Sequence, residues 1–200
     1  MEMLKSSYLE RYNTVLIQLA REIEDDLIKH LKGIRNIDRI YSRPKSVDKF
    51  LQKADIIEEN GKKRYSDPIN QIQDQIGARI IGFYLDDIEI ISKAVLNNYR
   101  HIELENKIPE SEKEFGYEGQ HLMLIIPPEL KPDGIKSQLI PNFFELQIRT
   151  LFQHAFSEGS HDLAYKPGVI LSKEQKRKVA FAAAQAWGGD LIFNELQREL

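Results

Sequence analysis

Residues 76–85, IGARIIGFYL, constrain the fold of this chain more than any other segment. Their β-branched and aromatic side chains occupy both alternating sets of positions, which is typical of a strand covered on both faces. Arg79 is the only charged residue among them. Because an arginine inside an apolar strand needs a partner, we expect it to meet a protein carboxylate or the phosphate or base of a nucleotide.

The segments after this run predict an alternation of helix and strand. Asp86 and Asp87 can cap a helix that ends near Asn98. Residues 121–126 predict a second buried strand, and Phe143–Thr150 predict a third, which is reached through a loop rich in proline, glycine and lysine. The middle of the chain is therefore expected to form a sheet.

Amphipathic helices are predicted on either side of this sheet. Between residues 4 and 31, apolar residues recur three or four positions apart, which indicates a helix that stops near Gly33. A basic stretch leads into a second helix from about Ser46, and another helix follows the third strand to about Tyr165. The last helix starts at Ser172, and one of its sides is formed by Val179, Ala183, Trp187, Leu191 and Leu196.

Composition limits the class of protein. A chain of 200 residues, 42% of them hydrophobic, can form one core of ordinary size. The net charge of −3 gives no overall positive field for nucleic acid, and the lack of cysteine excludes disulfides and thiolate metal sites. No stretch approaches the roughly 18 apolar residues that span a bilayer. We therefore expect a soluble, cytoplasmic, single-domain protein that does not enter a membrane.

Two carboxylates are candidates for a metal site. In Phe143–Thr150, the two-residue period of a strand places Glu145 on a polar face, although a solvent-facing edge strand would show the same pattern. Asp74 lies just before the central strand, where strand ends commonly present ligands, and Gly77 allows close backbone approach. On neighbouring strands the two carboxylates would suit Mg²⁺, which completes its shell with water and phosphate oxygens.

A basic segment and a tyrosine are candidates for binding a nucleotide. Arg43, Lys45 and Lys53 could pair with a triphosphate, although charged runs more often form a solvated surface. Tyr117 lies between two nearby glycines and could stack on a flat base. Its alternative interpretation is the buried tyrosine of a simple turn.

Two histidines and a carboxylate share one face of the helix after the third strand. His154, Glu158 and His161 are spaced three to four residues apart. Their spacing is not an established zinc signature, and no cysteine is present to complete one. We therefore do not expect zinc.

Five motifs follow one another along the chain: RPK, DQIGAR, GYEGQH, ELQIRT and HDLAYK. In this order they resemble the RelA/SpoT synthetase family, whose members carry R-x-K, D-x-x-G-x-R, G-Y-x-x-x-H, E-x-Q-I-R-T and H-x-x-x-Y-K. The resemblance implies an α+β fold with a mixed sheet of about five strands and flanking helices. It also implies a synthetase domain over residues 35–167, with an N-terminal helix in 1–34 and a C-terminal helix in 168–200 that packs on it.

The family reaction implies a role for each candidate. It moves pyrophosphate from ATP to the ribose 3′-hydroxyl of GDP or GTP with Mg²⁺, and yields the alarmone (p)ppGpp and AMP. Arg43 and Arg79 would enclose the adenine, Tyr117 would stack on the guanine, and Glu145 is also a candidate base. By resemblance, catalysis and metal binding fall to Asp74 and Glu145, ATP binding to Arg43, Lys45, Lys53 and Arg79, and acceptor binding to Tyr117, Gln147, Arg149, His154 and His161.

One motif departs from the family pattern. Many synthetases read GYRSLH, whereas Glu118 here replaces a cation near the acceptor with an anion. This change leaves other acceptors open, namely the tRNA 3′ end or an adenosine nucleotide, as in toxin relatives. A nucleotide-binding module without catalysis is a further alternative, which the presence of Asp74 and Glu145 disfavours. An antitoxin or a second copy of the chain is a candidate partner.

Overall fold

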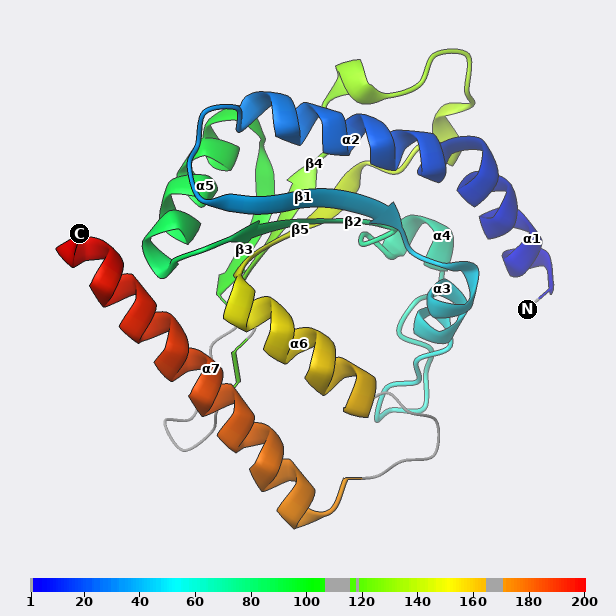
Figure 1. The fold of residues 1–200 in the computed structure, drawn as a ribbon. Coiled ribbons are helices and arrows are strands. Elements are labelled where there is room, and N and C mark those ends of the chain that lie inside the picture. Colours follow the sequence, from blue (N-terminus) through cyan, green and yellow to red (C-terminus); the bar gives the residue numbers. More distant parts are fainter. Residues whose placement is uncertain (1, 107–115, 118, 165–170) are drawn as a thin grey trace.

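Within the residues that the structure describes, 2–106, 116–117, 119–164 and 171–200, a five-stranded mixed sheet forms the centre of this computed structural model (Figure 1). The strands are β1 (Ile37–Pro44), β2 (Ile76–Gly82), β3 (His101–Asn106), β4 (Gln120–Ile125) and β5 (Phe143–Thr150). Their order is β1-β2-β5-β4-β3, with β2 and β5 parallel and the other neighbours antiparallel. The predicted α+β fold with a mixed sheet of about five strands is confirmed.

Helices lie on both faces of this sheet. They are α1 (Glu2–Arg11), the π-helical turn η1 (Tyr12–Leu16), α2 (Ile17–His30), α3 (Val47–Ala54), α4 (Pro68–Gln71), α5 (Leu85–Asn98), the 3-10 turns η2 (Pro128–Leu130) and η3 (Ser137–Leu139), α6 (Leu151–Ala164) and α7 (Lys173–Glu199). α2 and α5 cover one face, whereas α6 extends from β5 below the other and packs on α7 (Figure 1). In the described part of the chain, no helix combines the length and apolarity that crossing a membrane requires.

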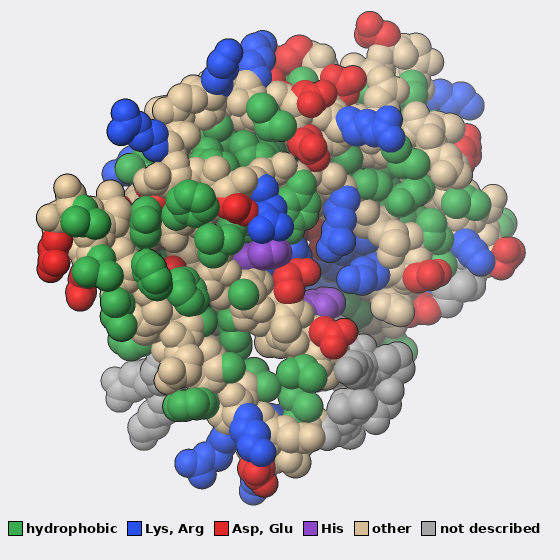
Figure 2. Space-filling view, in the orientation of Figure 1, with side chains coloured by type: hydrophobic (Ala, Val, Ile, Leu, Met, Phe, Trp, Pro, Cys, Tyr) green, Lys and Arg blue, Asp and Glu red, His purple; other side chains and the backbone are tan. Residues whose placement is uncertain are grey.

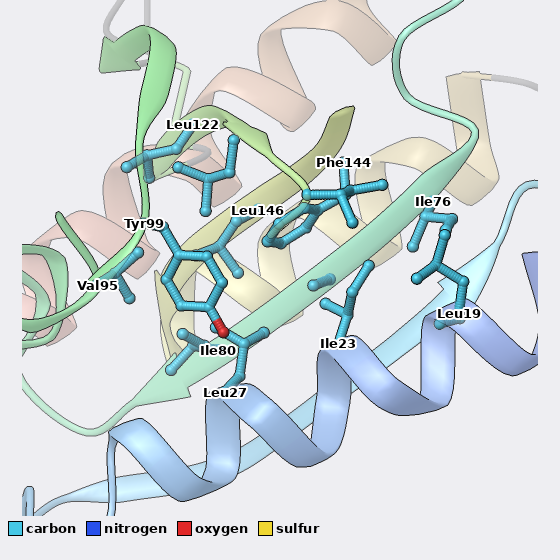
Figure 3. Packing of buried hydrophobic residues seen from close by; sticks show 14 of the residues in the cluster. Leu19, Ile23, Leu27, Ile76, Ile80, Val95, Tyr99, Leu122, Phe144 and Leu146 are labelled. Atoms are coloured by element: carbon cyan, nitrogen blue, oxygen red, sulfur yellow. The ribbon is translucent and has the colours of Figure 1, made fainter. Parts of the chain in front are cut away.

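The main core lies between α2 and the sheet (Figure 3). Leu19, Ile23 and Leu27 follow one another along one side of α2 and are fully buried with Ile80 of β2 and Leu146 of β5. Each such side chain contributes roughly 1.5–3 kcal/mol through removal of apolar area from water. The predicted apolar faces of the N-terminal helix and of the third strand are confirmed. Polar side chains of β2 and β5 lie on the opposite face of the sheet.

Both edge strands were missed by the sequence prediction. β1 contains Asp38, Arg39 and Arg43, and every residue of β3 is exposed, so neither segment has the apolar run that indicates a strand. An edge strand tolerates such side chains because it is paired on one side only. β2 also ends at Gly82, earlier than predicted, because α5 begins at Leu85.

Helix α7 packs differently from the pattern of its sequence. Of the apolar side predicted for it, only Ala183 is buried, whereas Trp187 and Leu196 are 45% and 48% exposed. The other buried residues of α7 are the polar Asp190 and Asn194. Polar contacts therefore contribute much of the packing of α7 on the rest of the protein, and the apolar periodicity of its sequence does not predict them.

Candidate active site

A cleft opens on the face of the sheet that points away from α2. It has a volume of about 890 Å³, which is typical of sites for small ligands. Figure 2 shows basic, acidic and histidine side chains gathered around this hollow. The predicted site residues that line it are Arg43, Lys45, Asp74, Arg79, Glu145, Gln147, Arg149 and His161.

Strand pairing aligns four polar side chains in a row across the floor of the cleft. Tyr41 of β1 pairs with Arg79 of β2, and Arg79 pairs with Gln147 of β5. Gln147 pairs in turn with His121 of β4. Paired residues point to the same face of a sheet, so these side chains all face the cleft.

A second row lies two residues away and is open at its centre. Gly77 of β2 pairs with Arg43 on one side and with Glu145 on the other. A Cβ atom at Gly77 would meet no other atom within 4 Å. The missing side chain therefore leaves free space between the cation and the carboxylate.

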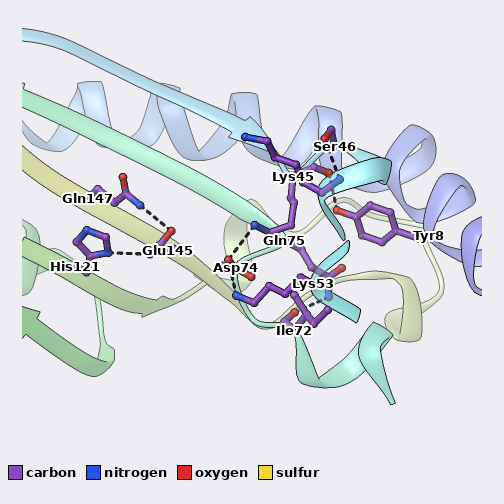
Figure 4. Close-up of polar contacts among 11 residues, drawn as sticks. Tyr8, Lys45, Ser46, Lys53, Ile72, Asp74, Gln75, His121, Glu145 and Gln147 are labelled. Atoms are coloured by element: carbon purple, nitrogen blue, oxygen red, sulfur yellow. Dashed lines mark hydrogen bonds and ion pairs between the residues drawn. The ribbon is translucent and has the colours of Figure 1, made fainter. Parts of the chain in front are cut away.

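Asp74 lies at the entry to β2 and binds two lysines (Figure 4). Its Oδ2 is 3.0 Å from the Lys45 Nζ and 2.8 Å from the Lys53 Nζ. Burial alone would raise the pKa of Asp74, but the two ammonium groups outweigh it and hold the pKa below its ordinary value. Its Oδ1 is buried and has no hydrogen-bond partner among the described residues. Asp74 is thus an ionised carboxylate with one oxygen available.

Glu145 accepts hydrogen bonds on both carboxylate oxygens (Figure 4). His121 Nδ1 lies 3.0 Å from Oε1, and Gln147 Nε2 donates to Oε2 at 3.0 Å. Arg149 Nη2 lies 3.3 Å from His121 Nε2, and because a guanidinium only donates, this network assigns the proton of the neutral ring to Nδ1. Burial would raise the pKa of Glu145, but the hydrogen bonds from His121 and Gln147, together with the electrostatic effect of His121, outweigh it and lower the pKa.

Three side chains accept hydrogen bonds from the guanidinium group of Arg79. Its Nε donates to Gln147 Oε1 at 2.9 Å, and its Nη1 donates to the Tyr41 hydroxyl at 2.9 Å and to Glu158 Oε1 at 2.5 Å. Glu158 is the carboxylate partner that an arginine in an apolar strand was expected to need. These in-plane bonds fix the orientation of the guanidinium.

Residues 42–169 match a family model described as "Region found in RelA / SpoT proteins". This match covers more than half of the chain. The chain belongs to the RelA/SpoT family. The resemblance inferred from the five ordered motifs is thereby confirmed.

Similar RelA/SpoT proteins include one of assigned activity and two of known structure. GTP pyrophosphokinase YjbM of Bacillus subtilis (strain 168) is 27% identical over an alignment of 206 residues that covers 96% of this chain and 90% of that protein. Small alarmone synthetase 1 of Bacillus subtilis, bound to its product pppGpp, superposes with a TM-score of 0.71 at 26% identity, over 90% of this chain and 94% of that one. A GTP pyrophosphokinase family protein of Streptococcus pneumoniae, with a TM-score of 0.73, 20% identity and coverage of 97% and 93%, shares the fold.

Three predicted site residues do not line the cleft of this RelA/SpoT protein. Lys53 reaches Asp74 from α3. Tyr117 donates its hydroxyl to Asp190 of α7 at 2.5 Å. His154 lies on α6, and its Nδ1 is buried without a hydrogen-bond partner in the described part of the chain. The remaining motif residues Glu118, Tyr165 and Lys166 lie outside the described residues.

The site contains three residues to which the sequence prediction gave no role. His121 was visible as the last residue of the GYEGQH motif, but its contact with Glu145 depends on the pairing of β4 with β5. Tyr41 gave no signal, because β1 was not predicted as a strand. Glu158 was grouped with the helix histidines, whereas its partner is Arg79 across the cleft.

The carboxylates fit the divalent cation that pyrophosphokinases of this family generally use. Asp74 has a buried oxygen without a partner, and its charge is close enough to raise the pKa of Glu145 against the effect of His121. Among the described residues, no group of three or more acidic, histidine or cysteine side chains converges. A cation held here would therefore take its other ligands from water and substrate oxygens.

Proposed function

We propose that this chain is a pyrophosphotransferase that moves the β,γ-pyrophosphate of ATP to the ribose 3′-hydroxyl of GDP or GTP, and so forms (p)ppGpp and AMP. One observation carries the proposal: two ionised carboxylates, Asp74 and Glu145, meet a set of cationic side chains in one cleft of a RelA/SpoT protein. The similarity to a GTP pyrophosphokinase and to a synthetase bound to pppGpp supports the guanine acceptor.

The ATP half of the site is assigned to the β1 and β2 side of the cleft. Arg43 and Arg79 project from paired strands and would enclose the adenine between their guanidinium groups. Lys45 and Lys53 lie together on one oxygen of Asp74, so both can turn to the phosphates of an incoming nucleotide. This arrangement places positive charge where negative charge develops during transfer.

Mg²⁺ is the cation that we assign to Asp74 and Glu145. The partnerless Oδ1 of Asp74 offers a buried ligand atom, and Glu145 lies across the open floor above Gly77. When bound, such a cation offsets negative charge on the phosphate oxygens. The hydrogen bonds from His121 and Gln147 fix the orientation of Glu145.

Orientation and metal binding suit Glu145 better than proton abstraction. A good general base has a pKa near the working pH, whereas the pKa of Glu145 is lowered below its ordinary value. The other ring nitrogen of His121, Nε2, accepts a hydrogen bond from Arg149. Phosphoryl transfer through a loose transition state needs little help from a base. We therefore assign the rate enhancement to charge and alignment.

The acceptor half is assigned to the β4 and β5 side of the cleft. Tyr117 would stack on the guanine, and the remaining predicted acceptor residues would orient its ribose and phosphates. These residues are Gln147, Arg149, His154 and His161. ATP and guanine nucleotides as substrates also favour the cytoplasm as the place of action.

The test is incubation of the purified protein with labelled ATP and Mg²⁺ plus, separately, GDP, GTP, ATP or bulk tRNA. We expect label on GDP or GTP and release of AMP. Glu145→Gln keeps the shape of the side chain and should lower the rate by about a thousandfold or more. Label on tRNA or ATP alone would assign the chain to the toxin-type alternative. No labelled acceptor, with Glu145→Gln indistinguishable from the wild type, would support a non-catalytic binding module.

A protein partner is a separate proposal. Large apolar side chains are exposed along α7, including Phe181, Ile192 and Phe193 at 66%, 58% and 51%. Apolar residues concentrated on one element are common where a second copy or another protein binds. Sedimentation of the purified chain distinguishes the two partners, since self-association requires no antitoxin.

A further inference from the structure

Asp190 is a buried acid on α7 without a cationic partner. It is 1% exposed, and in the described part of the chain no lysine, arginine or histidine forms an ion pair with it. Its Oδ2 accepts two hydrogen bonds, one from the Tyr117 hydroxyl and one from Thr150 Oγ1, both at 2.5 Å. A buried acid held only by neutral donors is costly, so its position suggests a purpose beyond stability.

Thr150 connects Asp190 to the strand that carries the active-site residues. It is the last residue of β5, which also holds Glu145 and Gln147. Its Oγ1 accepts from the Gln153 amide at 3.0 Å, and Gln153 Oε1 accepts from the Thr150 amide at 2.9 Å. This reciprocal pair caps the start of α6. Asp190 is therefore anchored to a rigid junction of strand and helix.

Tyr117 is held at the rim of the cleft from two sides. Its neighbour Gly116 lines the cleft. Gly119 has a φ of +88°, and a Cβ there would lie 2.6 Å from the Ile148 carbonyl oxygen and 2.9 Å from Arg149 Cγ. Gly119 can therefore lie against β5 only because it has no side chain. The hydroxyl at the other end of the ring is held by Asp190.

We propose that Asp190 is a positioning residue for the acceptor nucleotide. By binding the Tyr117 hydroxyl, it anchors the outer end of the ring at the rim of the cleft, so that an aromatic face is ready to stack on the acceptor base. A ring that is ordered before binding loses less entropy when the base arrives. The identity of the ligand rests on the proposed function, whereas the contact between Asp190 and Tyr117 does not. Helix α7 thereby contributes to acceptor binding from outside the catalytic strands.

Steady-state kinetics test this role through the two Michaelis constants. Asp190→Ala should raise KM for GDP about tenfold and leave KM for ATP within about twofold, because only the acceptor side loses its support. Asp190→Asn keeps an acceptor oxygen and should recover most of the loss. Asn194→Ala is the matched control: it lies one turn further along α7, is 5% exposed, and contacts Asp86 instead of Tyr117. It should leave KM for GDP unchanged.

A double-mutant comparison isolates the contact. Tyr117→Phe keeps the ring and removes the hydroxyl, so Asp190→Ala should add little to KM for GDP in that background. Three results would overturn the proposal: an equal rise in both Michaelis constants, the same rise in Asn194→Ala, or full additivity of Tyr117→Phe and Asp190→Ala.

Nuclear magnetic resonance supplies a readout that needs no activity. In protein labelled with ¹³C at tyrosine Cζ, the Tyr117 signal is the one absent from Tyr117→Phe. Asp190→Ala should shift this signal, whereas Asn194→Ala should not. An unchanged Tyr117 chemical shift in Asp190→Ala would contradict the positioning role. If the signal shifts in Asp190→Ala but does not respond to added GDP or GTP, the contact between Asp190 and Tyr117 is confirmed. That result would instead contradict the proposed acceptor.

Discussion

At the residue scale, neighbouring side chains set the charge and the orientation of a few residues of the site. Although burial would raise the pKa of both carboxylates, two lysines keep Asp74 ionised, and His121 together with Gln147 keeps Glu145 ionised. Three in-plane bonds orient Arg79. Each effect depends on contacts between residues far apart in the sequence. The sequence therefore predicted Asp74, Glu145 and Arg79, but not their charge state or orientation, nor the partners His121, Tyr41 and Glu158.

Asp74 leads to a prediction about pH. Its pKa is lowered in the folded protein, so the ionised form stabilises the fold above the ordinary aspartate pKa of about 3.9, and this contribution is lost as the pH falls through the lower folded value. The difference in free energy of unfolding between the wild type and Asp74→Asn should therefore shrink between about pH 5 and pH 3. Urea titrations at several pH values measure it. A difference that grows on acidification would contradict this account.

Gly77 leads to a prediction about the open floor of the cleft. Gly77→Ala places a methyl group in the open floor of the cleft, where it meets no protein atom. Stability should stay the same or rise by about 0.5–1 kcal/mol, because glycine is unfavourable in a strand. KM for ATP should rise several-fold, because the methyl group occupies space between Arg43 and Glu145. Gly188→Ala, also in open space but on α7, serves as the control and should leave KM unchanged.

At the element scale, buried segments were predictable and edge segments were not. β2 and β5 carry apolar residues at the positions that face α2, so their sequences revealed them. β1 and β3 are edge strands without a run of apolar residues, and the sequence prediction missed both. Helix α7 was predicted, but its buried residues include the polar Asp190 and Asn194, which its apolar period did not indicate. The sequence thus predicted the floor of the site, whereas Tyr41 on β1 and the Asp190 contact required coordinates.

The segment before β4 leads to a prediction for Gly119. Gly119→Ala combines a left-handed backbone, with φ of +88°, and a clash with the Ile148 carbonyl oxygen. We expect a loss of about 2–4 kcal/mol in the free energy of unfolding and a higher KM for GDP. Gly134→Ala has a similar φ of +73° but meets no atom within 4 Å, so it should cost only about 1 kcal/mol. Equal losses in the two variants would contradict the close approach.

At the scale of the whole molecule, the N-terminal helix and the sheet share one core. Ile23 of α2 is fully buried among residues of β2 and β5. Ile23→Ala should therefore cost about 2–5 kcal/mol and lower the stability of helix and sheet together. Circular dichroism at 222 nm and ¹³C signals of the core residues should report the same shifted midpoint. A separate early transition of α2 would show that residues 1–34 form an independent unit.

The position of β5 in the sheet also governs when the protein can first act. β5 lies between β2 and β4, although it is the last strand in the sequence. Asp74 leaves the ribosome about seventy residues before Glu145, and synthesis at about 5–20 residues per second separates them by roughly 4–14 seconds. Until β5 inserts, a nascent chain carries Asp74 and the strands to which we assign ATP binding, but lacks Glu145. We therefore expect translation products that end before β5 to be unable to consume ATP.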